Sequence, residues 1–74
     1  MSAHEKLRRR LANLKHEETQ LKARIKAYEA LERKLSKKGD PQKWYEASRE
    51  LKSLREKHRE NTRRQEEIRD VLGE

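Results

Sequence analysis

Apolar residues recur along the first half of the chain in alternating steps of four and three. The series is Leu7, Leu11, Leu14, Leu21, Ile25, Tyr28 and Leu35, with Glu18 and Glu32 at the two remaining positions. This heptad spacing places the side chains on one narrow seam of a helix, as in coiled coils. Ser2 followed by Glu5 is a capping-box pattern, and no Gly or Pro occurs before Gly39. The pattern predicts a helix over residues 3–38, about 50 Å long.

The same spacing resumes after residue 41. Its positions are Trp44, Ala47, Leu51, Leu54, His58, Asn61, Gln65, Ile68 and Leu72. The seam is apolar near residue 41, polar over three positions of its outer half, and apolar again at the far end. Gly73 then provides a stop signal. A second helix is therefore predicted over residues 41–72.

Lys38-Gly39-Asp40-Pro41 joins the two segments. Gly39 can take the left-handed conformation that ends a helix, Asp40 can cap the next helix, and Pro41 suits its first turn. A turn of residues 39–40 is so short that the helices must fold back on each other. We predict an all-α fold, an antiparallel two-helix hairpin (coiled coil), as one domain over residues 1–74. Such a hairpin can complete a larger bundle with a partner or a second copy.

Antiparallel arms bring the two seams into one register. The facing pairs include Leu35 with Trp44, Leu21 with His58, Glu18 with Asn61, Leu14 with Gln65 and Leu7 with Leu72. The four polar residues at these positions, Glu18, His58, Asn61 and Gln65, form a polar seam. A buried carboxylate needs a partner, water or a covering protein. If the polar seam is buried, replacing Glu18 and Asn61 together by Leu should stabilise the isolated hairpin.

Composition restricts the functions that the chain can have. With 30% hydrophobic and 47% charged residues among 74, it cannot enclose a globular core, although the strict periodicity favours order over disorder. Cysteine is absent, and His4, His16 and His58 do not converge in the predicted register. No nucleophile or second carboxylate accompanies Glu18. We expect no catalysis, no metal, no cofactor and no small-molecule substrate.

No apolar run approaches the length of a membrane span or of a signal-peptide core. We therefore expect no membrane partner and a cytoplasmic location, or a place inside a cytosolic or viral assembly. The formal net charge of +7 favours an anionic or acidic partner, although such a charge also keeps a small protein in solution.

Basic residues gather in two places where phosphates can bind. The hinge cluster consists of Arg33, Lys34, Lys37, Lys38 and Lys43, and the outer cluster of Arg8, Arg9, Arg10, Arg63 and Arg64. The outer cluster is interspersed with acidic residues, whereas the hinge cluster is less mixed. An accessory protein of a nucleoprotein particle that binds RNA or DNA through these clusters is the alternative function.

Small and aromatic residues mark candidate protein-binding positions. Ala23, Ala27 and Ala30 form a stripe beside the seam that Leu31 continues, and Trp44 and Tyr45 are adjacent after the hinge. One aromatic can close the core while the other faces outward, and alanine also simply favours a helix. Because a hairpin buries one seam only, we predict a non-enzymatic adaptor that binds another protein or self-associates.

The residues around the hinge resemble two kinds of helical hairpin. Gly39-Asp40, Trp44 and the run Arg49-Glu50-Leu51-Lys52-Ser53-Leu54 are similar to the small co-chaperones of type III secretion needle subunits. Gly39-Asp40-Pro41 between two long helices also resembles the antiparallel coiled-coil fingers that bind Rho-type GTPases. Both resemblances imply a hairpin that binds another protein, and neither assigns a site residue.

Overall fold

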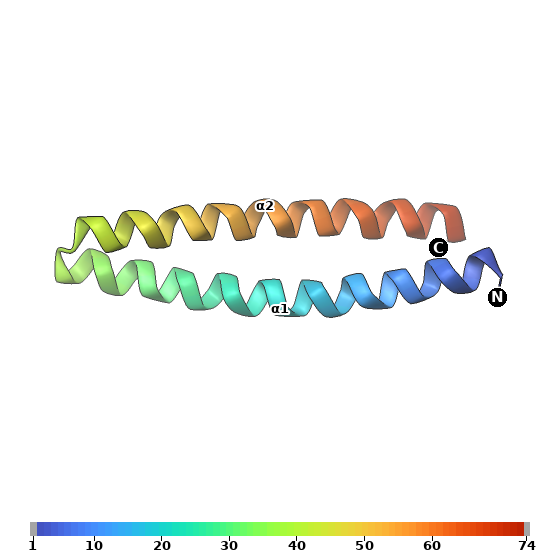
Figure 1. The fold of residues 1–74 in the computed structure, drawn as a ribbon, viewed down its shortest axis with the longest axis horizontal. Coiled ribbons are helices and arrows are strands. Elements are labelled where there is room, and N and C mark those ends of the chain that lie inside the picture. Colours follow the sequence, from blue (N-terminus) through green and yellow to red (C-terminus); the bar gives the residue numbers. More distant parts are fainter. Residues whose placement is uncertain (1, 74) are drawn as a thin grey trace.

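The computed structural model describes residues 2–73 and contains two α-helices joined by a two-residue turn. Helix α1 spans Ala3–Lys38 and α2 spans Pro41–Leu72. The helices run antiparallel, side by side, in a rod of 55 × 16 × 14 Å whose turn lies at one end (Figure 1). The predicted all-α antiparallel hairpin is confirmed.

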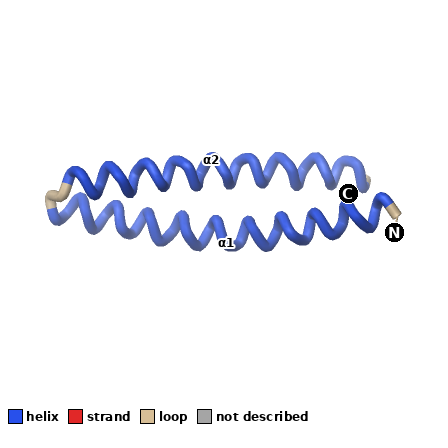
Figure 2. The backbone as a smooth tube through the Cα atoms, viewed as in Figure 1, coloured by secondary structure: helices blue, strands red, loops and turns tan. Residues whose placement is uncertain are grey.

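Local capping determines where the helices begin and end. The Ser2 hydroxyl accepts a hydrogen bond from the Glu5 N–H at 3.1 Å, which starts α1. Gly39 has a φ of 69° and closes α1, while the Asp40 carboxylate accepts a hydrogen bond from the Lys43 N–H at 3.2 Å and starts α2. Pro41 stands at the first position of α2. Figure 2 shows how little chain remains between the helices.

The core is a single line of side chains between α1 and α2. Its buried apolar members are Leu11, Leu14, Leu21, Leu35, Ala47, Leu51, Leu54 and Ile68, and all of them occupy predicted seam positions. At the outer end, Leu7 and Leu72 pack against the cluster of Leu11, Leu14 and Ile68. The heptad pattern therefore identified the buried line correctly.

The seam is less closed at the hinge end than predicted. Trp44, expected to face Leu35 in the core, is 40% exposed, and its neighbour Tyr45 is 59% exposed. Trp44 lies in the first turn of α2, beside Leu35, Ser36 and the turn residues, where the end of the hairpin leaves the rest of the indole open to solvent. The expectation that one of the two aromatics closes the core is wrong for this geometric reason.

Neither α1 nor α2 has a segment that is long and apolar enough to cross a membrane.

Replacing Gly39 by Ala should lower the free energy of unfolding by about 1–2 kcal/mol, because an L-residue is strained in the left-handed conformation. A methyl group at Gly39 would meet no atom within 4 Å, so the loss comes from the backbone alone. Gly73→Ala is the matched control: its φ is 79° and its site is equally open. Because Gly73 only ends α2 whereas Gly39 connects both helices, urea melts followed by circular dichroism should show the larger loss at Gly39. Equal losses at the two glycines would contradict this account of the turn.

Candidate interaction surfaces

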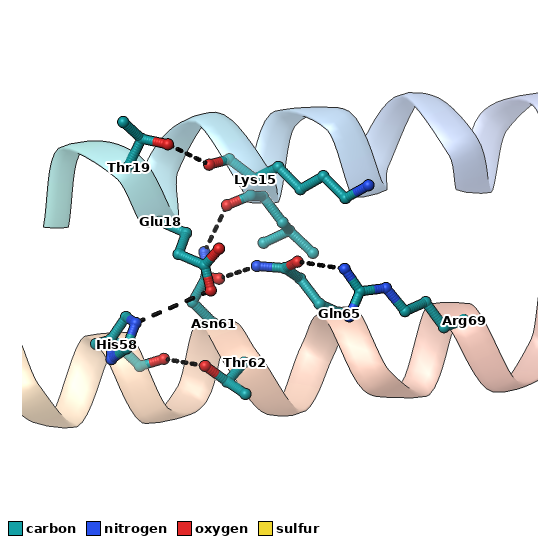
Figure 3. Close-up of polar contacts among 9 residues, drawn as sticks. Lys15, Glu18, Thr19, His58, Asn61, Thr62, Gln65 and Arg69 are labelled. Carbon is teal, nitrogen blue, oxygen red and sulfur yellow. Dashed lines mark hydrogen bonds and ion pairs between the residues drawn. The ribbon is translucent and has the colours of Figure 1, made fainter. Parts of the chain in front are cut away.

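Two buried amides occupy the polar seam. Asn61 and Gln65 are 2% and 3% exposed, the only polar residues within residues 2–73 to be so buried. The Asn61 amide donates to the main-chain oxygen of Leu14 at 2.9 Å, and the Gln65 amide donates to the Asn61 side-chain oxygen at 2.6 Å (Figure 3). A guanidinium nitrogen of Arg69 donates to the Gln65 side-chain oxygen at 3.4 Å. The hydrogen-bonded chain thus leads from the core to the edge of α2.

The two titratable members of the polar seam lie at its margin. A carboxylate oxygen of Glu18 is 3.9 Å from Nε2 of His58, which is too long for a hydrogen bond, and both side chains are partly exposed (Figure 3). The Nε2 atom itself is buried and has no hydrogen-bond partner within the described part of the chain. Glu18 and His58 therefore form an ion pair only when the imidazole is protonated.

The predicted pairing of Glu18 with Asn61 differs from the observed arrangement. Asn61 bonds to the backbone of Leu14, one turn before Glu18, and Glu18 reaches solvent beside His58. Desolvating a carboxylate costs far more than desolvating an amide, and an amide can be satisfied by a backbone carbonyl. The amide consequently takes the buried place and the carboxylate the outer one.

The six predicted protein-binding residues do not form one surface. Leu31, 41% exposed, lines a groove of about 550 Å³ between α1 and α2. We call this the Leu31 groove; it is formed by Tyr28, Leu31, Leu35, Lys43, Glu46, Ala47 and Glu50. Trp44 instead lines a different groove of about 300 Å³ with Glu32, Arg33, Ser36 and Lys37. Leu31 and Trp44 therefore belong to separate candidate sites.

The remaining members of that set are also dispersed. Ala23, Ala27 and Ala30 are all exposed on α1, and Ala23 borders a third groove, which also contains Ile25 and His58. Tyr45 faces outward, with the Arg49 guanidinium 5.9 Å from its ring centre in a cation–π contact. The alanine stripe thus remains uncovered by α2.

The two basic clusters differ in how far acidic residues neutralise them. In the outer cluster, Arg63 and Arg64 approach Glu60 to 2.6 Å and 3.3 Å. The hydrogen bond from Arg63 lowers the pKa of Glu60, and the same bond raises the pKa of Arg63. Arg8, Arg9 and Arg10 are exposed near the outer end of α1. Arg63 and Arg64 are thus already paired with Glu60.

The hinge cluster has no such neutralisation. Its members Arg33, Lys34, Lys37, Lys38 and Lys43 are all exposed, and among residues 2–73 no ion pair engages any of them. Uncompensated cations in one place attract an anionic partner. No three His, Asp or Glu side chains of the described residues come together as metal ligands.

Several polar contacts between the helices were not anticipated from the sequence. Arg55 pairs with Glu29 at 3.2 Å, Arg24 pairs with Glu50 at 3.7 Å, and the Ser48 hydroxyl donates to Glu32 at 2.7 Å. Glu32 is itself a seam position, and the other five residues flank the seam, as the e and g positions of coiled coils do. The predicted register also specifies which residues flank the seam on each helix, and applying it to those flanking positions would have identified these contacts.

Comparison with known proteins identifies no relative: no family model, no curated protein and no solved structure matches the chain. The two resemblances around the hinge therefore stay predictions. The candidate surfaces rest on the geometry and charge of the hairpin.

The amide chain predicts an ordering of stabilities. Asn61→Leu alone leaves the buried Gln65 amide without its acceptor, whereas Asn61→Leu together with Gln65→Leu removes both groups and adds apolar contact. The double variant should exceed the single one by about 1–3 kcal/mol in the free energy of unfolding, measured by urea titration. The Leu14 carbonyl keeps its helical hydrogen bond in both variants.

The Glu18→Leu/Asn61→Leu variant serves as the comparison. This variant also leaves the Gln65 amide without its acceptor, and the carboxylate that it replaces is already in contact with solvent. It should therefore be less stable than Asn61→Leu/Gln65→Leu. The opposite order would show that Asn61 does not satisfy Gln65.

Proposed function

We propose that the chain is a non-enzymatic, cofactor-free interaction module that binds a helix of another protein, or of a second copy, in the Leu31 groove. The observation that carries the proposal is the 41% exposure of Leu31 above a groove whose other walls include the buried side chains of Leu35 and Ala47. A third helix in this groove would extend the core beyond the single seam, and the chain would act as an adaptor. A cytoplasmic location, or a cytosolic or viral assembly, belongs to the same proposal.

Energetics support a partner at this place. Two helices bury one seam, and two of its deepest positions are amides rather than apolar side chains. Apolar burial contributes about 25 cal/mol per Å², so covering Leu31 and Tyr28 adds stabilisation that the hairpin alone lacks. The groove joins directly onto the core at Leu35, so the added contact is continuous with it.

The charges at the groove indicate which helix it would accept. Lys43, Glu46 and Glu50 of α2 all line it, and Arg24 pairs with Glu50. A partner helix with an apolar stripe and charges of both signs would match this rim. Such complementarity affects the choice of partner more than the affinity.

Leu31→Glu should abolish binding of the partner helix, because it places a carboxylate in an apolar groove beside Glu46 and Glu50. Sedimentation velocity over an approximately hundredfold concentration range tests the second-copy form, since a contact of one kcal/mol or more shifts a dimer equilibrium measurably. If wild type dimerises, Leu31→Glu should be monomeric. Val71→Glu is the control, since Val71 is also an aliphatic side chain, 64% exposed, at the outer end of α2.

If wild type is a monomer throughout that range, the second-copy form is rejected. A photo-crosslinking residue at position 31, compared with one at position 71 in the same native lysate, then tests the form with another protein. The proposal expects a discrete adduct from position 31 alone. Identical adduct patterns from both positions, or none from position 31, would overturn it.

A further inference from the structure

A row of four cations follows one side of α1. Lys22, Lys26, Arg33 and Lys37 succeed one another in steps of four, seven and four residues, so they share one side of the helix. Each four-residue step advances about 6 Å along the axis. All four side chains are exposed, and no ion pair recorded between residues 2 and 73 involves them.

The carboxylates nearest to this row are directed to α2 instead. Glu29, between Lys26 and Arg33 in the row, pairs with Arg55 at 3.2 Å, and Glu32 accepts the Ser48 hydroxyl at 2.7 Å. Arg55 also lines a groove of about 610 Å³ together with Lys22 and Lys26. The acidic residues therefore bridge the helices while the positive charge of the row stays available.

The single tryptophan of the chain lies at the hinge end of this row. Trp44 lines a groove with Arg33 and Lys37 and leaves 40% of its surface exposed. We call the surface formed by Lys22, Lys26, Arg33, Lys37, Trp44 and Arg55 the Trp44 face. An aromatic ring beside a line of unpaired cations is the combination that single-stranded nucleic acids bind.

We propose that the Trp44 face binds single-stranded RNA or DNA, with backbone phosphates along the cation row and an unpaired base stacked on the Trp44 indole. Phosphates require clustered cations and no particular sequence. A base of a duplex is already stacked on its neighbours, so only an unpaired base is free to cover the indole.

A protein helix fits this face less well. The large apolar side chains of the two grooves along this face are Ile25, beside Lys22 and Lys26, and Trp44, and they are separated by about 15 Å along the rod at the standard helical rise. The polar bridges Glu29–Arg55 and Glu32–Ser48 lie between them. A partner helix would have to cover these bridges without a continuous apolar stripe, whereas a polyanion with separate bases needs none. The inference is independent of the Leu31 groove, which Trp44 does not line.

Intrinsic fluorescence of Trp44 provides a direct test on the full chain. Unlabelled oligothymidine and oligouridine of about 20 nucleotides, enough for several cation contacts, are titrated at about 50–200 mM salt. We expect saturable quenching, with the affinity falling as salt rises at a logarithmic slope of about −2 to −3, which corresponds to three or four phosphates at −0.7 each. A blunt duplex of equal length should bind about tenfold more weakly and quench less, since stacking is lost.

Three variants locate the site. Trp44→Leu should weaken single-strand binding about tenfold, measured by anisotropy of a labelled strand. Lys22→Gln/Lys26→Gln should reduce the salt slope by about 1.4. The matched control Arg63→Gln/Arg64→Gln removes the same charge at arginines already paired with Glu60, and should change the slope far less. Helicity of each variant is checked by circular dichroism, and the exposed lysine pair cannot disturb the core.

Three results would overturn the inference. They are absence of saturable binding at the lowest salt, binding without quenching of Trp44, and equal loss from the lysine and control arginine pairs. Polyglutamate is included as an acidic polypeptide without bases: if it binds as tightly as oligothymidine, the face is a general polyanion or protein surface and the proposal fails.

Discussion

The single seam between α1 and α2 is the only interior that the described chain has, and the remaining features follow from this restriction. A seam of this kind buries one line of side chains, with Leu51 and Leu54 among its most deeply buried members. Most residues outside the line are exposed, and some beside it, such as Ser48 and Thr62, are half-buried. This explains why a chain with 47% charged residues folds as a rod: the heptad positions need apolar side chains and the others do not.

The same restriction gives the polar seam its structural effect. Asn61 has its amide satisfied by the Leu14 carbonyl of α1 and its oxygen by Gln65, one turn further along α2. Unsatisfied buried amides are costly, so these two hydrogen bonds are what allows Asn61 and Gln65 to occupy core positions. The outer half of α2 thus buries less apolar surface, and its two buried amides are hydrogen-bonded.

The seam also divides the surface into two unlike sides. The Leu31 groove has an apolar wall and charges of both signs, whereas the Trp44 face has cations whose neighbouring carboxylates are engaged with α2. The cross-helix pairs Arg24–Glu50 and Arg55–Glu29 are exposed and contribute little stability individually. Their main consequence is electrostatic, because they decide which cations remain unpaired. One small hairpin can thereby present different chemistry to two partners.

The sequence alone determined the hairpin, because each decisive signal is local or strictly periodic. Gly39, Asp40 and Pro41 specify the turn within three residues, and the heptad spacing identifies the buried line without knowledge of any contact. The composition likewise indicated that no globular core exists. Helix ends, fold class and nearly all buried positions could therefore be predicted.

Only the tertiary structure decided how far individual side chains are buried and which groups they contact. Periodicity placed Trp44 on the seam, but its exposure depends on its position in the first turn of α2, next to the end of the hairpin. It placed Glu18 opposite Asn61, but the amide bonds to the Leu14 backbone, because a carbonyl acceptor has no signature in side-chain spacing. The sequence made both Leu31 and Trp44 candidates for protein binding, and only the structure shows that they line different grooves. Rotamers and solvent access across the interface settle such questions, since they depend on the distances between two helices and not on the spacing within either one.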